Sequence, residues 1–361
     1  MKKIYLHILS VIVLLLFSCT KNDHSFNPTP VPQIIEYSIN GQIARIDNSV
    51  HGITMMSVSL PYGTDISSLT ASFRTSDCTD ITVDGIDQIS AVTQNNFSTP
   101  VIYELQNNGE TNHYIVSIAY SNLPVLYINT PSEVDSRITW IENSTVFLTN
   151  AGGMSNIYTG SNIKGRGNTT WKYYPKKPYS IKLKSKEKVL GMAKDKHWAL
   201  IANYLDRTYI RNALTYLIEK QTNGIYWIPE GRYVDLVLNG KFVGNYFLCE
   251  KVRVSKKRID VAPSGCLLEF DNHFDETNKF KTQRLNMPVN IKYPDNDELS
   301  QSRFDSIRNL INRFETLITA KDFPSDGEYR SMIDFNSFAD WYLVTELINN
   351  TELSHPKSVF M

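Results

Sequence analysis

The sequence predicts a multidomain protein in which an all-β sandwich is followed by a larger α+β domain. Residues 34–122 contain short β-prone runs separated by Gly, Asn, Asp and Pro, a pattern typical of sandwiches. Residues 123–361 combine further strand patterns with stripes of apolar residues at helical spacing. A chain of 361 residues also has the length expected for about two domains.

The N-terminal segment carries targeting signals rather than a folded core. Two lysines precede an apolar run, 4–17, that is too short to span a bilayer and is followed by Cys19. This pattern predicts a lipoprotein signal peptide over residues 1–18, with an uncleaved signal anchor as the alternative. Cys19 would be the acylated N-terminus, and residues 19–33 an extended tether. We therefore expect a lipoprotein of the cell envelope, at the outer membrane or cell surface, bound to the membrane through its lipid anchor.

Charge and cysteine content exclude several classes of protein. The 37 basic and 37 acidic residues balance, so no nucleic-acid partner is expected. Besides Cys19, the cysteines are Cys78, Cys249 and Cys266, an odd number without Cys-x-x-Cys spacing. Such a pattern argues against a disulfide framework and against a zinc site. A Cys249–Cys266 bridge and buried free thiols both remain open.

The strand signals of residues 34–122 predict an immunoglobulin-like sandwich. The β-prone runs lie at residues 34–39, 42–46, 53–60, 69–73 and 81–83. The clearest pair joins 101–105 to 113–118 through Asn108 and Gly109, which accept the positive φ of a tight hairpin turn. Because a fold alone does not establish a function, the domain is interpreted as a passive spacer, with adhesion or carbohydrate binding as alternatives.

A glycine loop, 165–171, follows the opening strands of the second domain, expected at 125–129 and 138–148. Gly165 and Gly167 allow backbone N–H groups to approach an anion, and Arg166 between them can add a bidentate phosphate contact. A turn that only needs positive φ is the alternative interpretation.

A basic strand follows this loop. Alternation places Tyr179, Ile181 and Leu183 on one face and Lys182 and Lys184 on the other. Lys182 is either a phosphate ligand or part of a solvated basic face that attracts an acidic partner.

Helical patterns appear in three places. The first has a stripe that is expected to be buried, formed by Ile210, Ala213, Leu214, Leu217 and Ile218. Arg211 and Asn212 lie in its first turn, where backbone N–H groups point outward. Stripes within residues 304–317 and 338–348 predict two further helices. Ser337 with Asp340 resembles a capping box for the last helix.

Several of these segments occur together in an order that resembles one family. They are the loop 165–171, the basic strand 176–183, the Leu-Gly-Met sequence 190–192, the pair Arg211 and Asn212, and residues 248–251, which follow a predicted hairpin. Together they resemble the CotH family of atypical protein kinases, named for a spore-coat protein. The resemblance implies that residues 123–361 form an α+β, atypical protein-kinase-like domain that binds ATP and Mg²⁺.

The resemblance also implies which residues bind the nucleotide. Lys182 would take the place of the kinase small-lobe lysine and, with Arg166, would hold the ATP phosphates. Arg211 and Asn212 would help to shape the nucleotide pocket. Glu250 lies where a kinase passes from its small lobe to its large lobe, and backbone groups at such a crossing can read an adenine edge.

The catalytic residues implied by the resemblance are Glu352 and Lys182. Glu352 follows Asn350 by two residues and would occupy the place of the catalytic-loop base, which orients the acceptor hydroxyl. Asn350 would be a metal ligand. Many family members carry Asp at the position of Glu352, and the extra methylene shifts the carboxylate by about an ångström, enough to weaken positioning.

The end of the sequence bears on activity. Family members continue into a hairpin and a Trp-Asp-x-Asp segment whose carboxylate holds Mg²⁺ on the phosphates, and this sequence contains no such segment. The domain is therefore expected to be C-terminally incomplete. Two hypotheses follow: ATP- and Mg²⁺-dependent phosphorylation of Ser or Thr in a surface or secreted protein, or a catalytically inactive kinase-like scaffold that binds at the surface.

Overall fold

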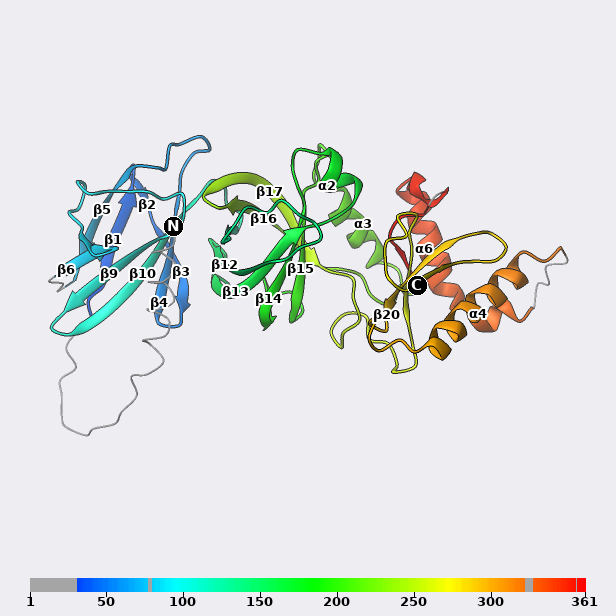
Figure 1. Ribbon diagram of the computed structural model, residues 1–361. Coiled ribbons are helices and arrows are strands. Elements are labelled where there is room, and N and C mark those ends of the chain that lie inside the picture. Colours follow the sequence, from blue (N-terminus) through cyan, green and yellow to red (C-terminus); the bar gives the residue numbers. More distant parts are fainter. Residues whose placement is uncertain (1–30, 77–79, 322–326, 355) are drawn as a thin grey trace.

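The computed structural model describes residues 31–76, 80–321, 327–354 and 356–361. The predicted signal peptide, Cys19, most of the tether and Cys78 lie outside the described residues. Three parts follow one another along the chain: a β-sandwich, a closed β-barrel, and a C-terminal part with a small sheet and helices (Figure 1). Among the described residues, no helix is both long enough and apolar enough to cross a bilayer.

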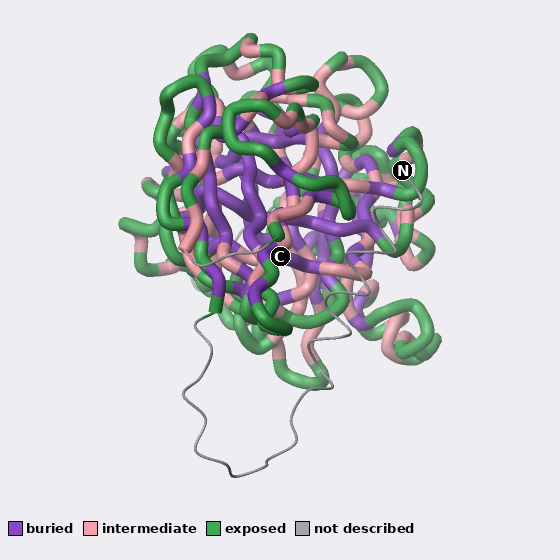
Figure 2. Tube along the Cα trace, turned by 90° about the vertical axis from the view of Figure 1, so that its left-hand side faces the viewer, coloured by how far each residue is buried: buried purple, intermediate pink, exposed green. Residues whose placement is uncertain are grey.

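The first part confirms the predicted β-sandwich. One sheet has the order β2-β1-β5-β8 and the other β3-β4-β10-β9-β6-β7. The strands are β1 (Ile34–Ile39), β2 (Gln42–Ile43), β3 (Arg45–Val50), β4 (Ile53–Ser59), β5 (Leu69–Thr75), β6 (Asp80–Val83), β7 (Ile86–Asp87), β8 (Gln94–Asn95), β9 (Val101–Asn107) and β10 (Glu110–Ala119). Apolar side chains from both sheets, such as Tyr37 and Tyr103, form the core. Figure 2, with the sandwich toward the viewer, shows buried strands inside and exposed turns around them.

The predicted hairpin of the sandwich is also confirmed. β9 and β10 pair antiparallel, with Asn107 opposite Glu110. Asn108 and Gly109 between them have φ of 49° and 88°, the left-handed values that their residue types accept.

The second part is a closed barrel with the strand order β11-β12-β13-β14-β15-β17-β16. Its strands are β11 (Val125–Asn129), β12 (Ile141–Thr149), β13 (Asn156–Gly165), β14 (Tyr179–Glu187), β15 (Asp195–Ile201), β16 (Gly231–Leu238) and β17 (Lys241–Glu250). Helix α2 (Thr169–Tyr173) joins β13 to β14, and α3 (Arg211–Glu219) precedes β16. Tyr179, Ile181 and Leu183 are buried in the apolar interior. Lys182 and Lys184 are exposed, as the alternation predicts.

The sandwich and the barrel share a hydrophobic core. Met55 and Ile115 of the sandwich pack in one cluster with Tyr127 and Phe147 of the barrel. The phenol of Tyr127 also donates a hydrogen bond to the backbone oxygen of Ile118 at 2.5 Å. The two parts are therefore joined by buried contacts as well as by the chain.

The third part packs a small sheet against a helix. The sheet has the order β19-β20-β18-β21. Its strands are β18 (Leu267–Phe270), β19 (Lys279–Lys281), β20 (Pro288–Tyr293) and β21 (Val359–Phe360), and the helical segments are α4 (Gln301–Ile318), α5 (Tyr329–Met332), α6 (Phe335–Leu347) and the short 3₁₀ helix η1 (Thr351–Ser354). Ile307 and Ile311 of α4 pack on Val289 and Ile291 of β20.

The structure corrects two expectations, on the α3 stripe and on the capping box of the last helix, and decides between the two alternatives for Cys249 and Cys266. The stripe of α3 is not buried, because Ile210, Leu214 and Leu217 are 52%, 47% and 58% exposed. The last helix begins after Asp334, whose carboxylate accepts from the backbone N–H of Asn336, so the capping box predicted at Ser337 is wrong. Cys249 and Cys266 are free thiols rather than a disulfide.

Candidate functional site

A group of five basic residues, here called the cation cluster, lies between the barrel and the C-terminal sheet. Its members are Lys164, Arg166, Lys251, Arg253 and Lys292. Burial, and then the charges of the other four, lower the pKa of Lys251 to about 8 from 10.5. The described residues include no ion-pair partner for the Lys251 ammonium group. Lys292 at the edge of the cluster is paired with Glu269 at 3.3 Å and with Glu276. The closely spaced cations around Lys251 are nevertheless suited to binding an anion.

A buried arginine fixes the backbone beneath this cluster. The Arg258 guanidinium donates a hydrogen bond to the backbone oxygen of Lys251 at 2.9 Å and lies over the Trp198 ring at 5.1 Å. It also lies 3.8 Å from an oxygen of Asp195 and 3.9 Å from an oxygen of Glu250. Burial opposes ionisation of Asp195, but hydrogen bonds from His197 and the charge of Arg258 outweigh it, so the pKa of Asp195 is lowered. This ion group holds the position of Lys251.

Glu250 belongs to that buried ion group. Its side chain is 2% exposed, and burial raises its pKa. Its backbone N–H donates to the oxygen of Glu230, and its carboxylate accepts from the Glu230 N–H at 3.0 Å. Its backbone N–H is therefore already occupied within the protein, and the side chain supports the Lys251 segment.

Lys182 borders the cation cluster. It pairs in register with His197 across β14 and β15, so both side chains leave the same face of the sheet. The His197 ring contacts the guanidinium of Arg253. The exposed ammonium group of Lys182 is therefore next to the cluster without being one of its buried members.

The glycine loop is explained by close packing. A Cβ on Gly165 would lie 2.4 Å from the Trp171 ring, and Gly167 has φ of +76°. The first glycine makes room for an indole and the second forms a left-handed turn, which supports the alternative interpretation of this loop. Arg166 between them contributes its charge to the cation cluster.

Arg211 and Asn212 begin α3 as predicted. The Arg211 side chain is 85% exposed, and its Nε lies 3.8 Å from Asp206. The Asn212 amide donates to the Asn203 side chain at 2.8 Å, and Asn203 donates to the backbone oxygen of Tyr209. Among the described residues, the side-chain contacts of Arg211 and Asn212 fix the loop before α3 rather than reach the cation cluster.

Asn350 directly precedes η1, and Glu352 lies within it. The Asn350 side-chain oxygen accepts from the Glu352 N–H at 3.1 Å, and the Glu352 carboxylate lies 3.3 Å from the Lys357 ammonium group. Within the described residues, no group of three or more His, Cys, Asp or Glu side chains could hold a metal ion. Asn350 and Glu352 nevertheless offer the hard oxygen atoms that Mg²⁺ prefers, and Mg²⁺ often needs only one or two carboxylates when phosphates supply other ligands.

A large cavity opens at one end of the barrel and is here called the barrel-mouth pocket. It has a volume of about 1240 Å³, and its wall includes Asn168, Trp171, Tyr179 and His273. The pocket lies beside the glycine loop, and none of the residues predicted to bind nucleotide or metal lines it.

Six residues of this region were not predicted from the sequence: Lys164, Lys251, Arg253, Arg258, His273 and Lys292. Lys251 directly follows Glu250, so its position in a motif was visible, whereas its burial was not. No sequence signal distinguishes Arg258 or His273 from ordinary surface residues, because their partners come from distant segments.

Comparisons with known proteins agree with the sequence motifs. The family model described as CotH kinase protein matches residues 163–360, and the model described as SGBP, N-terminal, matches residues 34–118. No curated protein matches the chain. A solved Bacteroides thetaiotaomicron structure titled a "putative glycoside hydrolase" is 12% identical, covers 79% of this chain and 89% of its own, and has a TM-score of 0.21. The CotH model covers more than half of the chain, and the protein therefore belongs to the CotH kinase protein family.

Proposed function

We propose that this protein binds ATP at the cation cluster and transfers its terminal phosphoryl group to Ser or Thr hydroxyls of a surface or secreted protein. The observation that carries the proposal is Lys251, a half-buried lysine surrounded by four other cations. Such a cluster is strained by mutual repulsion, and a triphosphate would offset that repulsion.

The roles of individual residues follow from their chemistry. Arg166 presents a planar fork that can bind two phosphate oxygens, whereas Lys251 and Lys182 act as point charges. Mg²⁺, when bound with ATP, would neutralise charge that develops on the transferred group. Asn350 and Glu352 are the oxygen donors that the family resemblance assigns to the metal and to the acceptor hydroxyl.

The location is proposed from two further features. The lipid anchor at Cys19 would hold the protein in the cell envelope. The match of the sandwich to an N-terminal domain of surface glycan-binding proteins supports a position at the cell surface.

Nucleotide binding is tested by thermal unfolding of the full chain with and without Mg²⁺-ATP. A ligand at ~100 times its dissociation constant adds ~2.7 kcal/mol to the free energy of unfolding, so the wild type should gain several degrees. Lys251→Ala and Arg166→Ala should lose most of that gain, because each removes a cation of the cluster. Lys256→Ala, an exposed lysine nearby, is the matched control and should keep it.

The Lys182→Ala variant then decides between two arrangements. If Mg²⁺-ATP no longer raises the unfolding temperature of this variant, Lys182 binds the phosphates. If the rise is retained, Lys251 and Arg166 bind them without Lys182. If the wild type itself gains nothing from Mg²⁺-ATP, the kinase proposal is wrong.

A second candidate function is surface glycan binding without turnover. Tyr62 is 76% exposed and lies at the junction between sandwich and barrel. The centroid of its ring is 5.4 Å from that of the Phe242 ring. Exposed rings of this kind can stack on sugars. Retardation of the protein in gels that contain soluble polysaccharides, together with no response to Mg²⁺-ATP, would favour this function.

A further inference from the structure

Within the proposed function, we infer that His273 is the general base that takes the proton from the acceptor hydroxyl, and that Asp271 positions it. The inference rests on the proposed kinase activity and concerns residues outside the sequence motifs. Three observations support it: an imidazole with a fixed orientation, a pocket in front of it, and the cation cluster beside it.

Hydrogen bonds fix the His273 ring. Its Nδ1 lies 2.8 Å from Asp271 Oδ1, and the His273 backbone N–H donates to the same oxygen at 2.7 Å. Asp271 is held in turn by Ser358, directly before β21, because its Oδ2 accepts from the Ser358 N–H at 3.2 Å and hydroxyl at 3.3 Å. A carboxylate only accepts hydrogen bonds, so Nδ1 carries a proton, and in the neutral ring the lone pair lies on Nε2. A histidine held in this tautomer can act as a base.

The ring is accessible, whereas its partner is not. The His273 side chain is 31% exposed and the Asp271 side chain only 9%. His273 lines the barrel-mouth pocket, whose volume of about 1240 Å³ can hold a peptide segment with a Ser or Thr hydroxyl. Trp171 and Tyr179 give this pocket apolar wall area, and the exposed Lys172 adds charge.

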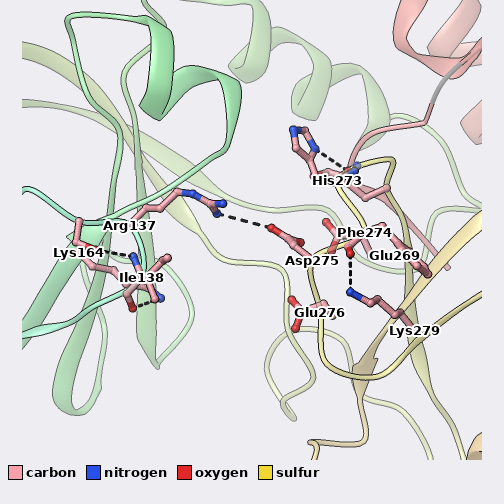
Figure 3. A network of polar contacts seen from close by, with 12 residues as sticks. Arg137, Ile138, Lys164, Glu269, His273, Phe274, Asp275, Glu276 and Lys279 are labelled. Carbon is pink, nitrogen blue, oxygen red and sulfur yellow. Dashed lines mark hydrogen bonds and ion pairs between the residues drawn. The ribbon is translucent and has the colours of Figure 1, made fainter.

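The pocket and the cation cluster are neighbours. Glu269, two residues before Asp271, lies 3.3 Å from the ammonium group of Lys292, a member of the cluster. On the barrel side, Lys164 of the cluster donates to the backbone oxygen of Ile138, next to the pocket residue Arg137. Figure 3 shows His273, Glu269, Arg137 and Lys164 in this one region. A hydroxyl in the pocket could therefore reach His273 on a side of the molecule that adjoins the cation cluster.

The proposed step is a single displacement. Nε2 of His273 takes the proton of the acceptor hydroxyl while the hydroxyl oxygen forms a bond to the γ-phosphorus of ATP. The bond from the γ-phosphorus to the oxygen that bridges it to the β-phosphate breaks, and ADP leaves with that electron pair. The proton stays on the imidazole until solvent takes it. Glu352, which is 55% exposed and pairs with Lys357, would orient the acceptor rather than deprotonate it.

The test measures ATP turnover of the full chain, with water and dephosphorylated casein as acceptors. His273→Ala should bind Mg²⁺-ATP like the wild type but turn it over ~100-fold more slowly or worse, the usual loss when a general base is removed. Added imidazole should restore part of the rate. Asp271→Asn should lower kcat with little change in KM for ATP, because the ring loses its tautomer while the cluster stays intact.

Two further variants separate catalysis from structure. His273→Gln keeps a donor for Asp271 but has no base, so it should be as slow as His273→Ala; full activity of this variant would overturn the inference. His113→Ala is the matched control, because His113 pairs with Glu104 at 3.5 Å in the sandwich, and it should show wild-type turnover without a response to imidazole.

The remaining outcomes are equally decisive. If His273→Ala turns over ATP within twofold of the wild type, His273 is not the base. If the wild type binds Mg²⁺-ATP but never turns it over, the inference fails while the nucleotide site stands. If the wild type does not bind Mg²⁺-ATP, the proposed function and this inference fail together.

Discussion

Lys251 is the residue on which the proposed nucleotide site depends most. Burial and the charges of Arg166, Lys292, Lys164 and Arg253 disfavour its protonated form and lower its pKa to about 8 from 10.5. Lys251 stays in this position although the repulsion is unfavourable, because Arg258 donates a hydrogen bond to the Lys251 backbone oxygen. Removing an unfavourable cation of this kind would relieve the repulsion in the free protein, and a bound polyanion would offset the same repulsion.

The pKa of Lys251 predicts how ATP affinity depends on pH. Its pKa is lowered, so the ammonium form is present below about pH 8 and is lost as the pH rises through that value. A bound polyanion favours the protonated lysine, so binding above pH 8 must take up a proton. Affinity for Mg²⁺-ATP should therefore fall between pH 8 and 9.5, approaching about tenfold per pH unit. Titration calorimetry at a series of pH values measures this.

The Lys251→Arg variant is the control for that pH dependence. Arginine stays protonated across this range, so its affinity should be nearly constant between pH 8 and 9.5. A wild-type affinity that is equally constant would show that Lys251 does not contact the ligand.

At the scale of elements, the turn between β13 and β14 determines the shape of the site. Gly165 ends β13 directly beneath the Trp171 ring, and the indole comes from α2, only a few residues later. The Lys177 ammonium group donates to the backbone oxygen of Trp171 at 2.6 Å and so fixes the short helix. The turn is therefore rigid through packing, and Arg166 within it is held in place.

Gly165→Ala is predicted to lower stability. Its Cβ would lie 2.4 Å from the Trp171 ring, and overpacking of this kind costs about 1–3 kcal/mol. Urea denaturation of Gly165→Ala, Trp171→Ala and the double variant should show strong coupling, because the second change removes the clash. If Gly165 instead served the close approach of a phosphate, the alanine variant would keep its stability and lose only ATP affinity.

In helix α3, the apolar pattern of the sequence did not predict burial. Its stripe has the spacing of a buried face, yet Ile210, Leu214 and Leu217 are largely exposed in the described structure. Helical spacing specifies which side chains share a face and does not specify what covers that face.

At the scale of the whole molecule, the sandwich is firmly attached to the barrel. Asn150 of the barrel is 4% exposed and donates to the backbone oxygen of Leu123 at 2.6 Å. Asp47 of the sandwich accepts from the Asn150 N–H at 2.7 Å and from the Ser155 hydroxyl at 3.1 Å. With the shared apolar cluster, these bonds favour a unit that unfolds as one, rather than a freely jointed spacer.

Asp47→Ala is predicted to destabilise both parts at once. The change leaves the N–H of Asn150 and the hydroxyl of Ser155 without their acceptor, which costs about 1–3 kcal/mol. Differential scanning calorimetry should show one transition moved to lower temperature. The control Asp65→Ala removes an exposed carboxylate that bonds only to Ser67 within a sandwich loop, and it should change little. Two separate transitions, with only one affected, would show that the domains unfold independently.

Much of the architecture could be predicted from the sequence, because strand alternation and turn residues act locally. The hairpin at Asn108 and Gly109 and the inward face of β14 are confirmed for this reason. The start of the last helix was missed because Asp334 and Ser337 are both capable caps, and only the path of the chain selects Asp334.

The sequence by itself determined the sandwich, the strands of the barrel and the family motifs, since these depend on residue types at short spacing. Only the tertiary structure decided which charged residues lie close together in the cation cluster. Lys164 and Lys292 come from β13 and β20, and Lys251 directly follows β17. Only the packing of the barrel against the C-terminal sheet brings them together. The same holds for His273, whose carboxylate partner is fixed by Ser358 from the far end of the chain. Long-range contacts carry no local signal, and for this reason the proposed site became visible only in the folded protein.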